Sequence, residues 1–256
     1  MSEAHGLRVW ITGASSGIGA AVATELAGRG ARVAVTARSL ERLAVVAEHG
    51  DVSVFAGDVT DRDRMAQIAS QIVEQWGGID IVVLNAGTYR PLPIDEFSSD
   101  EVRATFEVNV MGIVHCIEAV LPRMRADRRG RIALMSSVTA FAGFPLAAAY
   151  GSTKAYIANM GESLRADLAD SGVDISVVFP GFVATELTEQ NAFSMPLIIP
   201  ADQAARIIAD GLIRGRDEVA VPRRPFLAAR AFAAMPGPVR RRALRGIARR
   251  RRSDSS

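Results

Sequence analysis

The sequence predicts one α/β domain built on a doubly wound parallel sheet of about seven strands, with helices on both faces. Short β-branched runs that are apolar on both sides alternate with longer helical patterns along the 256 residues. Such runs are typical of strands that helices cover on each face. A glycine-rich turn directly follows the first run. Repeated βα units with right-handed crossovers then give a Rossmann-like fold.

Each element follows from a local signal. Strands are predicted at 7–12, 31–37, 52–56, 79–84, 131–136, 174–179 and 218–222. Helices are predicted at 17–29, 39–49, 61–76, 99–127, 148–170 and 201–214. Asp61 and Asp202 favour helix starts, and Gly77 and Gly172 favour helix ends. No repeat or linker interrupts residues 1–222, so we expect a single domain there, followed by a separate tail at 223–256.

The composition is that of a soluble globular protein, with 49% hydrophobic and 23% charged residues. Cys116 is the only cysteine, which excludes an intrachain disulfide and suits a reducing compartment. The first ten residues lack the basic and apolar regions of a signal peptide. No uninterrupted apolar run reaches the roughly 18 residues of a membrane span. We therefore expect a cytoplasmic protein.

The charge is unevenly distributed along the chain. Residues 1–222 hold 19 basic and 27 acidic side chains, whereas residues 223–256 hold 11 arginines and one aspartate. In this tail Val239, Ala243, Leu244 and Ile247 follow helical spacing. A basic amphipathic helix can make peripheral contact with an anionic membrane. The alternatives are a partly disordered extension and attraction to nucleic acid, although no nucleic-acid-binding module accompanies the arginines and no specific nucleic acid is expected.

The segment TGASSGIG, residues 12–19, lies between the first strand and the first helix. Glycines at this junction allow a tight turn, close approach of a phosphate and close helix packing, while the helix N-terminus supplies free N–H groups. A flexible loop is the alternative interpretation. We expect a dinucleotide to bind at Gly13, Ser15, Ser16, Gly17, Ile18 and Gly19.

The second strand ends in Thr36-Ala37-Arg38-Ser39, without a carboxylate. An acidic residue at this point binds the ribose 2′-hydroxyl of NAD, whereas an arginine accommodates the 2′-phosphate of NADP. Arg38 can pair with that phosphate through two hydrogen bonds. The sequence therefore favours NADP(H) as cofactor, and the alternative is that Arg38 is one more surface arginine.

Seven short segments occur in a fixed order: TGASSGIG, GDV at 57–59, NAG at 85–87, Asn109, SS at 136–137, YGSTK at 150–154 and PGFVAT at 180–185. In this combination the chain resembles the short-chain dehydrogenase/reductase family over about residues 7–221. The resemblance implies an oxidoreductase that uses a nicotinamide cofactor. It also implies a homodimer or homotetramer formed through the helices at 99–127 and 148–170.

The resemblance further implies that Asn109, Ser137, Tyr150 and Lys154 are catalytic. Tyr150 is the acid and base, and Lys154 also binds the cofactor ribose. Ser137, thirteen residues before Tyr150 and the second of the Ser136-Ser137 pair, holds the substrate oxygen. Asn109 holds a water that relays protons to Lys154. Further cofactor contacts are implied at Asp58 and Val59 near the adenine, at Asn85, Ala86 and Gly87 beneath the cofactor, and at Pro180, Gly181, Val183 and Thr185 near the nicotinamide.

Lys154 is the only lysine among 30 basic residues. Residues four apart share a helix face, so Lys154 is expected beside Tyr150. Hydride transfer to a ketone builds negative charge on its oxygen, which needs a proton donor. The pKa of a free tyrosine is about 10, and a nearby ammonium is expected to lower it. A planar guanidinium would not serve both the tyrosine and the ribose hydroxyls.

Apolar segments flank the expected site. We expect a lid from Phe193, Met195, Leu197, Ile198 and Ile199, and an opposite wall from Phe141, Phe144 and Leu146, with ordinary packing as the alternative. Such a pocket suits a hydrophobic ketone or secondary alcohol. His5, His49, His115 and Cys116 lack ligand spacing, so no metal is expected.

Two other functions are consistent with the same motifs. One is an NADP-sensing protein that binds the nucleotide without turnover, which would have no need for Ser137, Tyr150 and Lys154 together. The other is an NAD-linked alcohol dehydrogenase.

Overall fold

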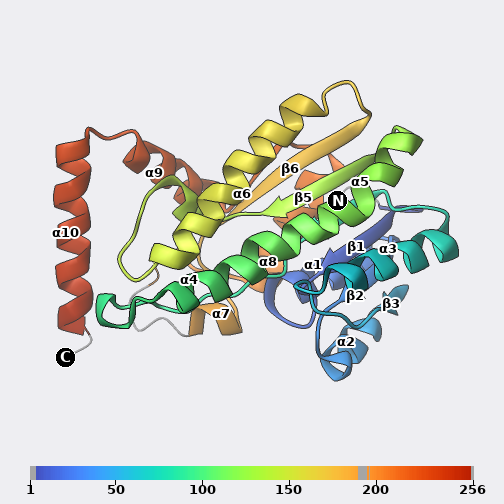
Figure 1. The fold of residues 1–256 in the computed structure, drawn as a ribbon, viewed down its shortest axis with the longest axis horizontal. Coiled ribbons are helices and arrows are strands. Elements are labelled where there is room, and N and C mark those ends of the chain that lie inside the picture. Colours follow the sequence, from blue (N-terminus) through green and yellow to red (C-terminus); the bar gives the residue numbers. More distant parts are fainter. Residues whose placement is uncertain (1–3, 190–194, 196, 255–256) are drawn as a thin grey trace.

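The computed structural model describes residues 4–189, 195 and 197–254. The predicted fold class is confirmed: seven parallel strands form one sheet in the order β3-β2-β1-β4-β5-β6-β9, with helices packed around it (Figure 1). The strands are β1 (Arg8–Thr12), β2 (Arg32–Thr36), β3 (Val52–Val54), β4 (Ile81–Leu84), β5 (Gly130–Met135), β6 (Val173–Pro180) and β9 (Glu218–Val221).

The order of the strands reverses at β1, which pairs with β2 on one side and β4 on the other. In an open α/β sheet, a crevice for ligands forms outside the carboxyl ends of the strands at this point. A separate pair of short strands, β7 (Val183–Ala184) and β8 (Ile199–Pro200), follows the carboxyl end of β6. The topology therefore places the ligand site at the carboxyl edge of the sheet.

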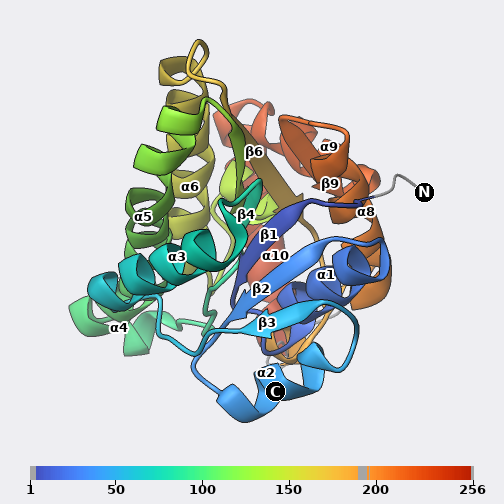
Figure 2. The same cartoon turned by 90° about the vertical axis from the view of Figure 1, so that its right-hand side faces the viewer.

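Helices cover both faces of the sheet (Figure 2). One face carries α1 (Gly17–Gly28), α2 (Leu40–Ala47) and α8 (Ala201–Ile213), and the other carries α3 (Arg62–Trp76), α5 (Gly112–Asp127) and α6 (Ala148–Asp167). Leu26 of α1 and Ile68 of α3 are fully buried in the two resulting cores. Burying a side chain of this size stabilises the fold by about 1.5–3 kcal/mol, which holds the strand ends in place.

The segment 99–127, predicted as one helix, changes its winding in the middle. After η1 (Ile94–Glu96), helix α4 (Ser99–Phe106) continues into a π-helical turn, η2 (Glu107–Met111), and then into α5. A single π-helical turn barely changes the spacing of apolar residues along a helix, so the sequence pattern did not reveal it. Such turns occur frequently at functional sites. Asn109 lies within this turn.

The same segment is apolar enough to resemble a membrane span. Ser99–Asp127 has 29 residues, with a mean hydropathy of 1.4 in its best window. In the structure, however, Ile113, Cys116 and Val120 are buried against α3 and the sheet. One side of this apolar segment therefore packs in the core.

The arginine-rich tail forms two helices. Helix α9 (Arg223–Ala233) packs on the body through Phe226, whose ring contacts those of Phe141 and Phe179 at centroid distances of 5.4 Å and 5.3 Å. Helix α10 (Gly237–Asp254) then stands apart, on the side toward which the strands point (Figure 1). Thus α9 is continuous with the packed body, and α10 extends over the carboxyl edge.

Candidate active site

The turn after β1 is pressed against the end of β4. Gly13 and Gly17 have φ angles of 65° and 57°, a left-handed conformation that favours glycine. A Cβ built on Gly13 would lie 2.5 Å from Ala86 Cα, and one on Gly19 would lie 2.3 Å from Gly13 O. Asn85 Nδ2 donates to Gly13 O at 3.0 Å. The turn therefore presents bare backbone beside Asn85 and Ala86.

Helix α1 begins at the end of this turn without a side-chain cap. Ser16 is its N-cap residue, and its side chain accepts no capping hydrogen bond. The helical pattern begins with Ala20 N donating to Ser16 O at 3.3 Å. The N–H groups of the first turn, at Gly17, Ile18 and Gly19, are thus oriented for an anion such as a pyrophosphate. Ser15 lies partly exposed just before them.

Arg38 lies exposed at the end of β2. Within the described ranges, its guanidinium forms no ion pair, whereas that of nearby Arg42 pairs with Glu186 at 2.9 Å. Asp58 Oδ1 accepts hydrogen bonds from the backbone and hydroxyl of Thr60, which fixes the carboxylate at the end of the neighbouring segment. Val59 follows and is buried. The end of β2 therefore carries an exposed guanidinium that forms no ion pair with a described residue.

Ser137 and Tyr150 meet where β5 ends and α6 begins. The Ser137 hydroxyl lies close enough to the phenol to oppose the rise of its pKa, and Ser137 Oγ accepts from Thr139 N at 3.2 Å. The preceding hydroxyl, that of Ser136, points elsewhere and donates to Lys154 O at 2.8 Å. Of the serine pair, it is thus Ser137 that lies beside the tyrosine.

Lys154 is one helical turn after Tyr150 and only 4% exposed. Its Nζ donates to Met135 O at 2.9 Å and lies 5.5 Å from the centre of the Tyr150 ring. The ammonium therefore faces the ring and the end of β5. It forms no hydrogen bond with the phenol oxygen in this state.

Burial is the largest influence on the pKa values of Tyr150 and Lys154. It raises the pKa of Tyr150 to about 12, an effect that the hydrogen bond with Ser137 opposes and nearby Tyr89 strengthens. Burial also lowers the pKa of Lys154 to about 8. The expectation that Lys154 lowers the pKa of Tyr150 is thus wrong for this state, because desolvation of the phenolate outweighs the distant ammonium.

Asn109 connects the π-helical turn to the site. Its Nδ2 donates to Thr88 O at 2.9 Å and Thr153 Oγ1 at 3.1 Å, and its Oδ1 accepts from Thr88 N at 2.7 Å. A Cβ built on Gly87 would lie 3.3 Å from Asn109 Oδ1 and 3.6 Å from Lys154 Nζ. Both N–H groups of the Asn109 amide donate hydrogen bonds, and Oδ1 accepts one. The second lone pair of Oδ1 is therefore the position at which a relay water could bind.

The segment after β6 closes the site opposite α1. Pro180 ends β6, and Gly181 N donates to Val221 O at 2.7 Å. Val183 is buried, and Thr185 packs against the glycine turn: a Cβ on Gly17 would lie 3.1 Å from Thr185 Cγ2. The structure therefore brings the segments after β1, β4, β5 and β6 together at one edge.

The expected apolar walls are only partly formed. Phe193 lies outside the described residues. Leu197 and Ile198 are exposed. Phe141 stacks on Phe179 at 5.1 Å, so it supports the wall from behind.

Two aromatic residues near the site were not anticipated from the sequence. Tyr89 packs edge-on against Tyr150 at 5.0 Å, and Phe232 of α9 stacks on Phe144 at 6.0 Å. Because Tyr89 follows Gly87 by two residues, its place near the site could have been predicted from the sequence. The place of Phe232 could not have been predicted, because this residue lies in the arginine-rich tail.

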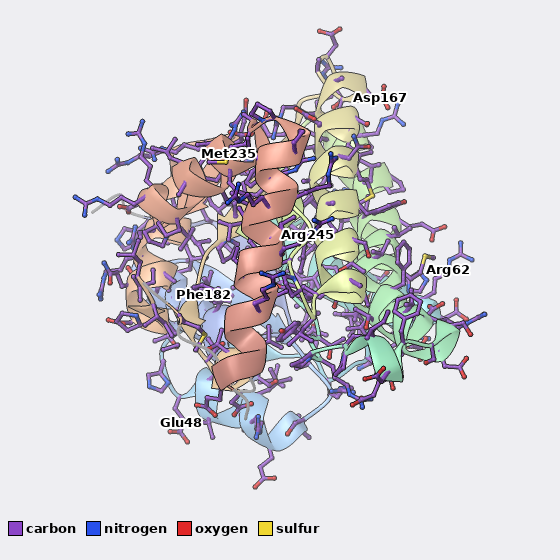
Figure 3. The ribbon with its side chains drawn as sticks, turned by 90° about the vertical axis from the view of Figure 1, so that its left-hand side faces the viewer. Glu48, Arg62, Asp167, Phe182, Met235 and Arg245 are labelled. Atoms are coloured by element: carbon purple, nitrogen blue, oxygen red, sulfur yellow. The ribbon has the colours of Figure 1, made fainter. Side chains whose placement is uncertain are left out.

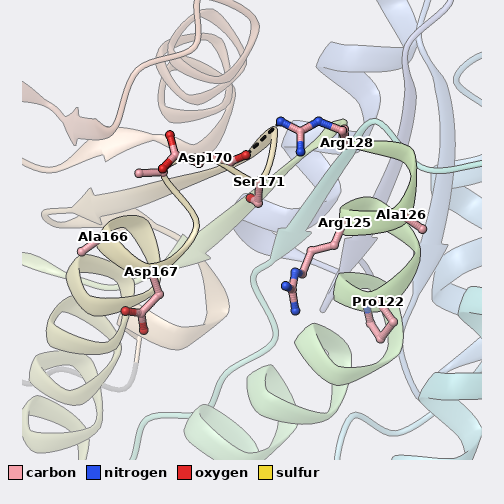
Figure 4. Close-up of a pocket in the computed structure, with 9 residues that line it drawn as sticks. Pro122, Arg125, Ala126, Arg128, Ala166, Asp167, Asp170 and Ser171 are labelled. Atoms are coloured by element: carbon pink, nitrogen blue, oxygen red, sulfur yellow. Dashed lines mark hydrogen bonds between the residues drawn. The ribbon is translucent and has the colours of Figure 1, made fainter.

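A cavity of about 630 Å³ lies far from these residues, between the ends of α5 and α6 (Figure 4). Its lining includes Arg125, Asp167 and Asp170, and Arg128 Nη2 donates to Asp170 O at 2.9 Å. Because α5 leads into the start of β5, this cavity is at the amino edge of the sheet. It is separate from the candidate active site.

Comparisons with known proteins agree with this geometry. The family model described as short chain dehydrogenase matches residues 8–194. An uncharacterized oxidoreductase of Myxococcus xanthus is 34% identical over 244 residues, covering 93% of this chain and 96% of that protein.

Two solved structures share the fold. A short chain dehydrogenase of Burkholderia cenocepacia in complex with NADP has a TM-score of 0.82 and 29% identity, covering 95% of this chain and 99% of that one. A short chain dehydrogenase/reductase of Burkholderia phymatum in complex with NAD has a TM-score of 0.81 and 22% identity, covering 90% and 94%. The family match over most of the sheet, together with the oxidoreductase relative, shows that the chain belongs to the short-chain dehydrogenase/reductase family.

Proposed function

We propose that this protein is an NADP(H)-dependent oxidoreductase that interconverts a hydrophobic ketone and a secondary alcohol. The observation that carries the proposal is the convergence of Ser137, Tyr150 and Lys154 at the carboxyl edge, beside a glycine turn that can hold a dinucleotide. Ser137 lies beside Tyr150, and Lys154 Nζ lies 5.5 Å from the tyrosine ring. A protein that only sensed the nucleotide would not need this arrangement.

The residues present fit a nicotinamide dinucleotide. The glycine turn leaves room that a Cβ would fill, and the uncapped start of α1 can bind the pyrophosphate. Asp58 and Val59 lie at the adenine end, Asn85, Ala86 and Gly87 lie beneath, and Pro180, Gly181, Val183 and Thr185 lie at the nicotinamide end. When bound, this cofactor supplies or accepts the hydride.

Arg38 supports NADP(H) rather than NAD(H). It is exposed, forms no ion pair with a described residue, and no carboxylate stands beside it at the tip of β2. The related structure from Burkholderia cenocepacia was determined with NADP. A guanidinium at this place can form two hydrogen bonds with a 2′-phosphate.

The catalytic residues have separate tasks. Ser137 donates to the carbonyl oxygen and holds it beside Tyr150, and Tyr150 gives that oxygen its proton during reduction. The raised pKa keeps the phenol protonated, which suits ketone reduction. Lys154 supplies positive charge next to the tyrosine and can bind the ribose hydroxyls. Asn109 positions the segment around Thr88 and offers Oδ1 to a water that connects Lys154 with solvent.

The substrate proposed is hydrophobic because the side chains around this edge are aromatic or aliphatic. Tyr89, Phe144 and Phe232 are grouped there, in contact with one another or with Tyr150. Leu197 and Ile198 lie exposed on the segment before β8. Apolar walls with a few polar groups are typical of small-molecule sites.

We also propose a homodimer or homotetramer through α5 and α6. The apolar segment Ser99–Asp127 has less than half of its best window buried, and Tyr156 of α6 is 45% exposed. A second copy of the chain would cover this surface. Light scattering on the purified protein measures the assembly directly.

Calorimetric titration with NADPH and NADH tests the cofactor. Wild type is expected to bind NADPH at least about tenfold more tightly, and Arg38→Ala is expected to remove that preference. Arg103→Ala is the matched control, since Arg103 is an exposed arginine of α4. Equal or tighter binding of NADH by wild type would favour the NAD-linked alcohol dehydrogenase.

Turnover separates the enzyme from a sensor. A panel of hydrophobic ketones with NADPH should give activity that Tyr150→Phe lowers by about 10²–10⁴-fold, with unchanged NADPH binding. NADPH binding without turnover on any ketone or alcohol would favour the sensing protein. If neither cofactor binds, the oxidoreductase proposal fails.

A further inference from the structure

The outer face of α10 carries arginines that the rest of the protein does not neutralise. Arg241, Arg242, Arg245 and Arg249, here called the arginine face, are all exposed. None of the four forms an ion pair with any residue in the described part of the chain. By contrast, ten of the arginines in residues 1–222 form salt bridges with carboxylates. The arginine face is therefore a positive surface without an internal partner.

The spacing concentrates this charge on one side of the helix. Arg241, Arg245 and Arg249 follow one another at intervals of four, and Arg242 lies three positions before Arg245. Residues at these intervals are neighbours on a helix surface, and like charges there repel one another. A bound polyanion relieves that repulsion. The opposite side, with Ala243, Leu244 and Ile247, is partly buried.

Exposed apolar side chains adjoin the arginine face. Val239 lies three positions before Arg242 and is 54% exposed, and Met235, at the elbow between α9 and α10, is 41% exposed. Figure 3 looks onto this side of the molecule, with Met235 beside the start of α10 and Arg245 partway along the helix. A phosphate-rich ligand without apolar groups would not contact the exposed methionine and valine. The boundary between headgroups and acyl chains of a bilayer can bind both the arginines and these apolar side chains.

This surface lies at the mouth of the candidate active site. Helix α9 joins the body through Phe226, and its Phe232 stacks on Phe144 of the substrate wall at 6.0 Å. Helix α10 extends from α9 on the side toward which the strands point (Figure 1). A flat anionic layer against α10 would therefore face the edge where the substrate enters.

We propose that α10 docks this protein on an anionic phospholipid bilayer, with the arginine face on the headgroups and Met235 and Val239 inserted between them. The cytoplasmic leaflet is the anionic one in cells, which suits the expected cytoplasmic location. The orientation places the active-site mouth toward the lipid, so that a membrane-dissolved substrate reaches it directly. The docking itself is independent of the cofactor and of catalysis.

Vesicle co-sedimentation tests the proposal with the full chain. Wild type should bind vesicles that contain phosphatidylserine and not vesicles of phosphatidylcholine alone, at about 0.1 M salt. The triple variant Arg241→Gln, Arg242→Gln, Arg245→Gln should lower the partition coefficient on the order of 100-fold. The matched triple Arg103→Gln, Arg125→Gln, Arg216→Gln removes the same charge from exposed body positions and should bind like wild type.

A second pair of variants tests the insertion of apolar side chains. Val239→Asp should weaken binding to the anionic vesicles, whereas Val45→Asp, at a similarly exposed position of α2, should not. A cooperative thermal unfolding transition in every variant verifies that it is folded. The variants replace exposed side chains, and a salt titration of wild type gives a second measurement of the same electrostatic attraction.

Other results of the vesicle experiments would contradict the docking proposal. Failure of wild type to bind anionic vesicles, equal binding to neutral ones, or equal losses in both arginine triples would overturn the proposal. Tighter binding to duplex DNA than to anionic vesicles at the same salt concentration would assign the arginine face to nucleic acid instead. A Val239→Asp protein that binds like wild type would exclude insertion of this side chain.

Discussion

Lys154 Nζ donates to Met135 O at 2.9 Å, so the ammonium beside Tyr150 is held by the end of β5. The proton donor and the cation both lie on α6 but contact different residues at the end of β5, because Ser137, two residues after Met135, lies beside Tyr150. Substitutions can therefore separate the two roles, and the neighbouring serines provide a matched pair.

Ser137→Ala and Ser136→Ala should have different effects. Ser137 lies beside Tyr150, and loss of a donor to a developing oxyanion lowers kcat about 10²–10³-fold. Ser136 donates to Lys154 O, so its loss should cost about 1 kcal/mol of stability with kcat little changed. Steady-state kinetics and urea unfolding of both variants measure the contrast. Equal kcat values in the two variants would contradict the assignment of Ser137.

The pH dependence of ketone reduction should reflect Lys154. Burial lowers its pKa to about 8, so the ammonium is lost above this pH. Tyr150, with its pKa raised to about 12, remains protonated across the same range. We expect kcat/KM to be constant below about pH 8 and to fall above it. In Lys154→Arg, which stays charged, the residual activity should lose this alkaline decline; a decline that persists would implicate another group.

Lys154→Met should stabilise the protein at neutral pH. The folded-state pKa of about 8 lies below the ordinary lysine value of 10.5, so at pH 7 the folded state holds a buried charge at a cost. One pKa unit corresponds to about 1.4 kcal/mol; after the lost bond to Met135 O is subtracted, a net gain of about 2 kcal/mol remains.

The direction of the Lys154 pKa shift determines the pH range over which the stability difference between the two proteins changes. Between the two pKa values the unfolded chain binds more protons than the folded one, so wild-type stability rises with pH there. The advantage of Lys154→Met should therefore shrink between about pH 8 and 10.5. Urea unfolding of both proteins at several pH values measures the difference, and a constant difference would show that the ammonium is not desolvated.

Gly19→Ala should remove cofactor binding, whereas Gly28→Ala should not. A Cβ on Gly19 would lie 2.3 Å from Gly13 O, which displaces the turn, whereas nothing lies within 4 Å of a Cβ on Gly28. A displacement of this kind can cost on the order of 100-fold in function. Alanine within a helix is more stable than glycine by roughly 0.5–1 kcal/mol. NADPH titration and thermal unfolding compare the two, and tight NADPH binding by Gly19→Ala would be inconsistent with the turn described.

Phe226→Ala should show that α9 is part of the folded body. Phe226 is 6% exposed, and removal of a buried phenylalanine typically costs about 3–5 kcal/mol. The KM for ketone should also rise, because Phe141 loses its support. Leu227→Ala, at a position that is 50% exposed, is the control and should change stability by less than about 0.5 kcal/mol. Similar unfolding of both variants would mean that α9 is only loosely attached.

The sheet was predictable because each strand leaves a local signal. Strands such as Ile81–Leu84 are apolar on both sides and flanked by helical patterns, so their positions and parallel arrangement follow from the sequence. The π-helical turn at Glu107–Met111 was not predictable. It differs from an α-helix by one hydrogen-bond register, and the apolar pattern passes through it unchanged.

The site was predictable in its residue types and less so in its electrostatics. The spacing of Tyr150 and Lys154 places both on one face of α6, but it does not show that the ammonium turns to Met135 O. Nor does it show how far burial opposes ionisation of the phenol. Phe226 could not be assigned to the body, because it lies in an arginine-rich tail and its partners, Phe141 and Phe179, are distant in the chain.

The single lysine gives this protein a built-in reporter. Lys154 carries the only side-chain primary amine, and its pKa of about 8 leaves much of it as free amine in mildly alkaline buffer. Because Lys154 is only 4% exposed, an acylating or aldehyde reagent can modify this position only in molecules whose active site is open to it, and otherwise only the α-amino group. Mass spectrometry of that single adduct would count how many active sites are open in a sample, without a substrate or an assay of turnover.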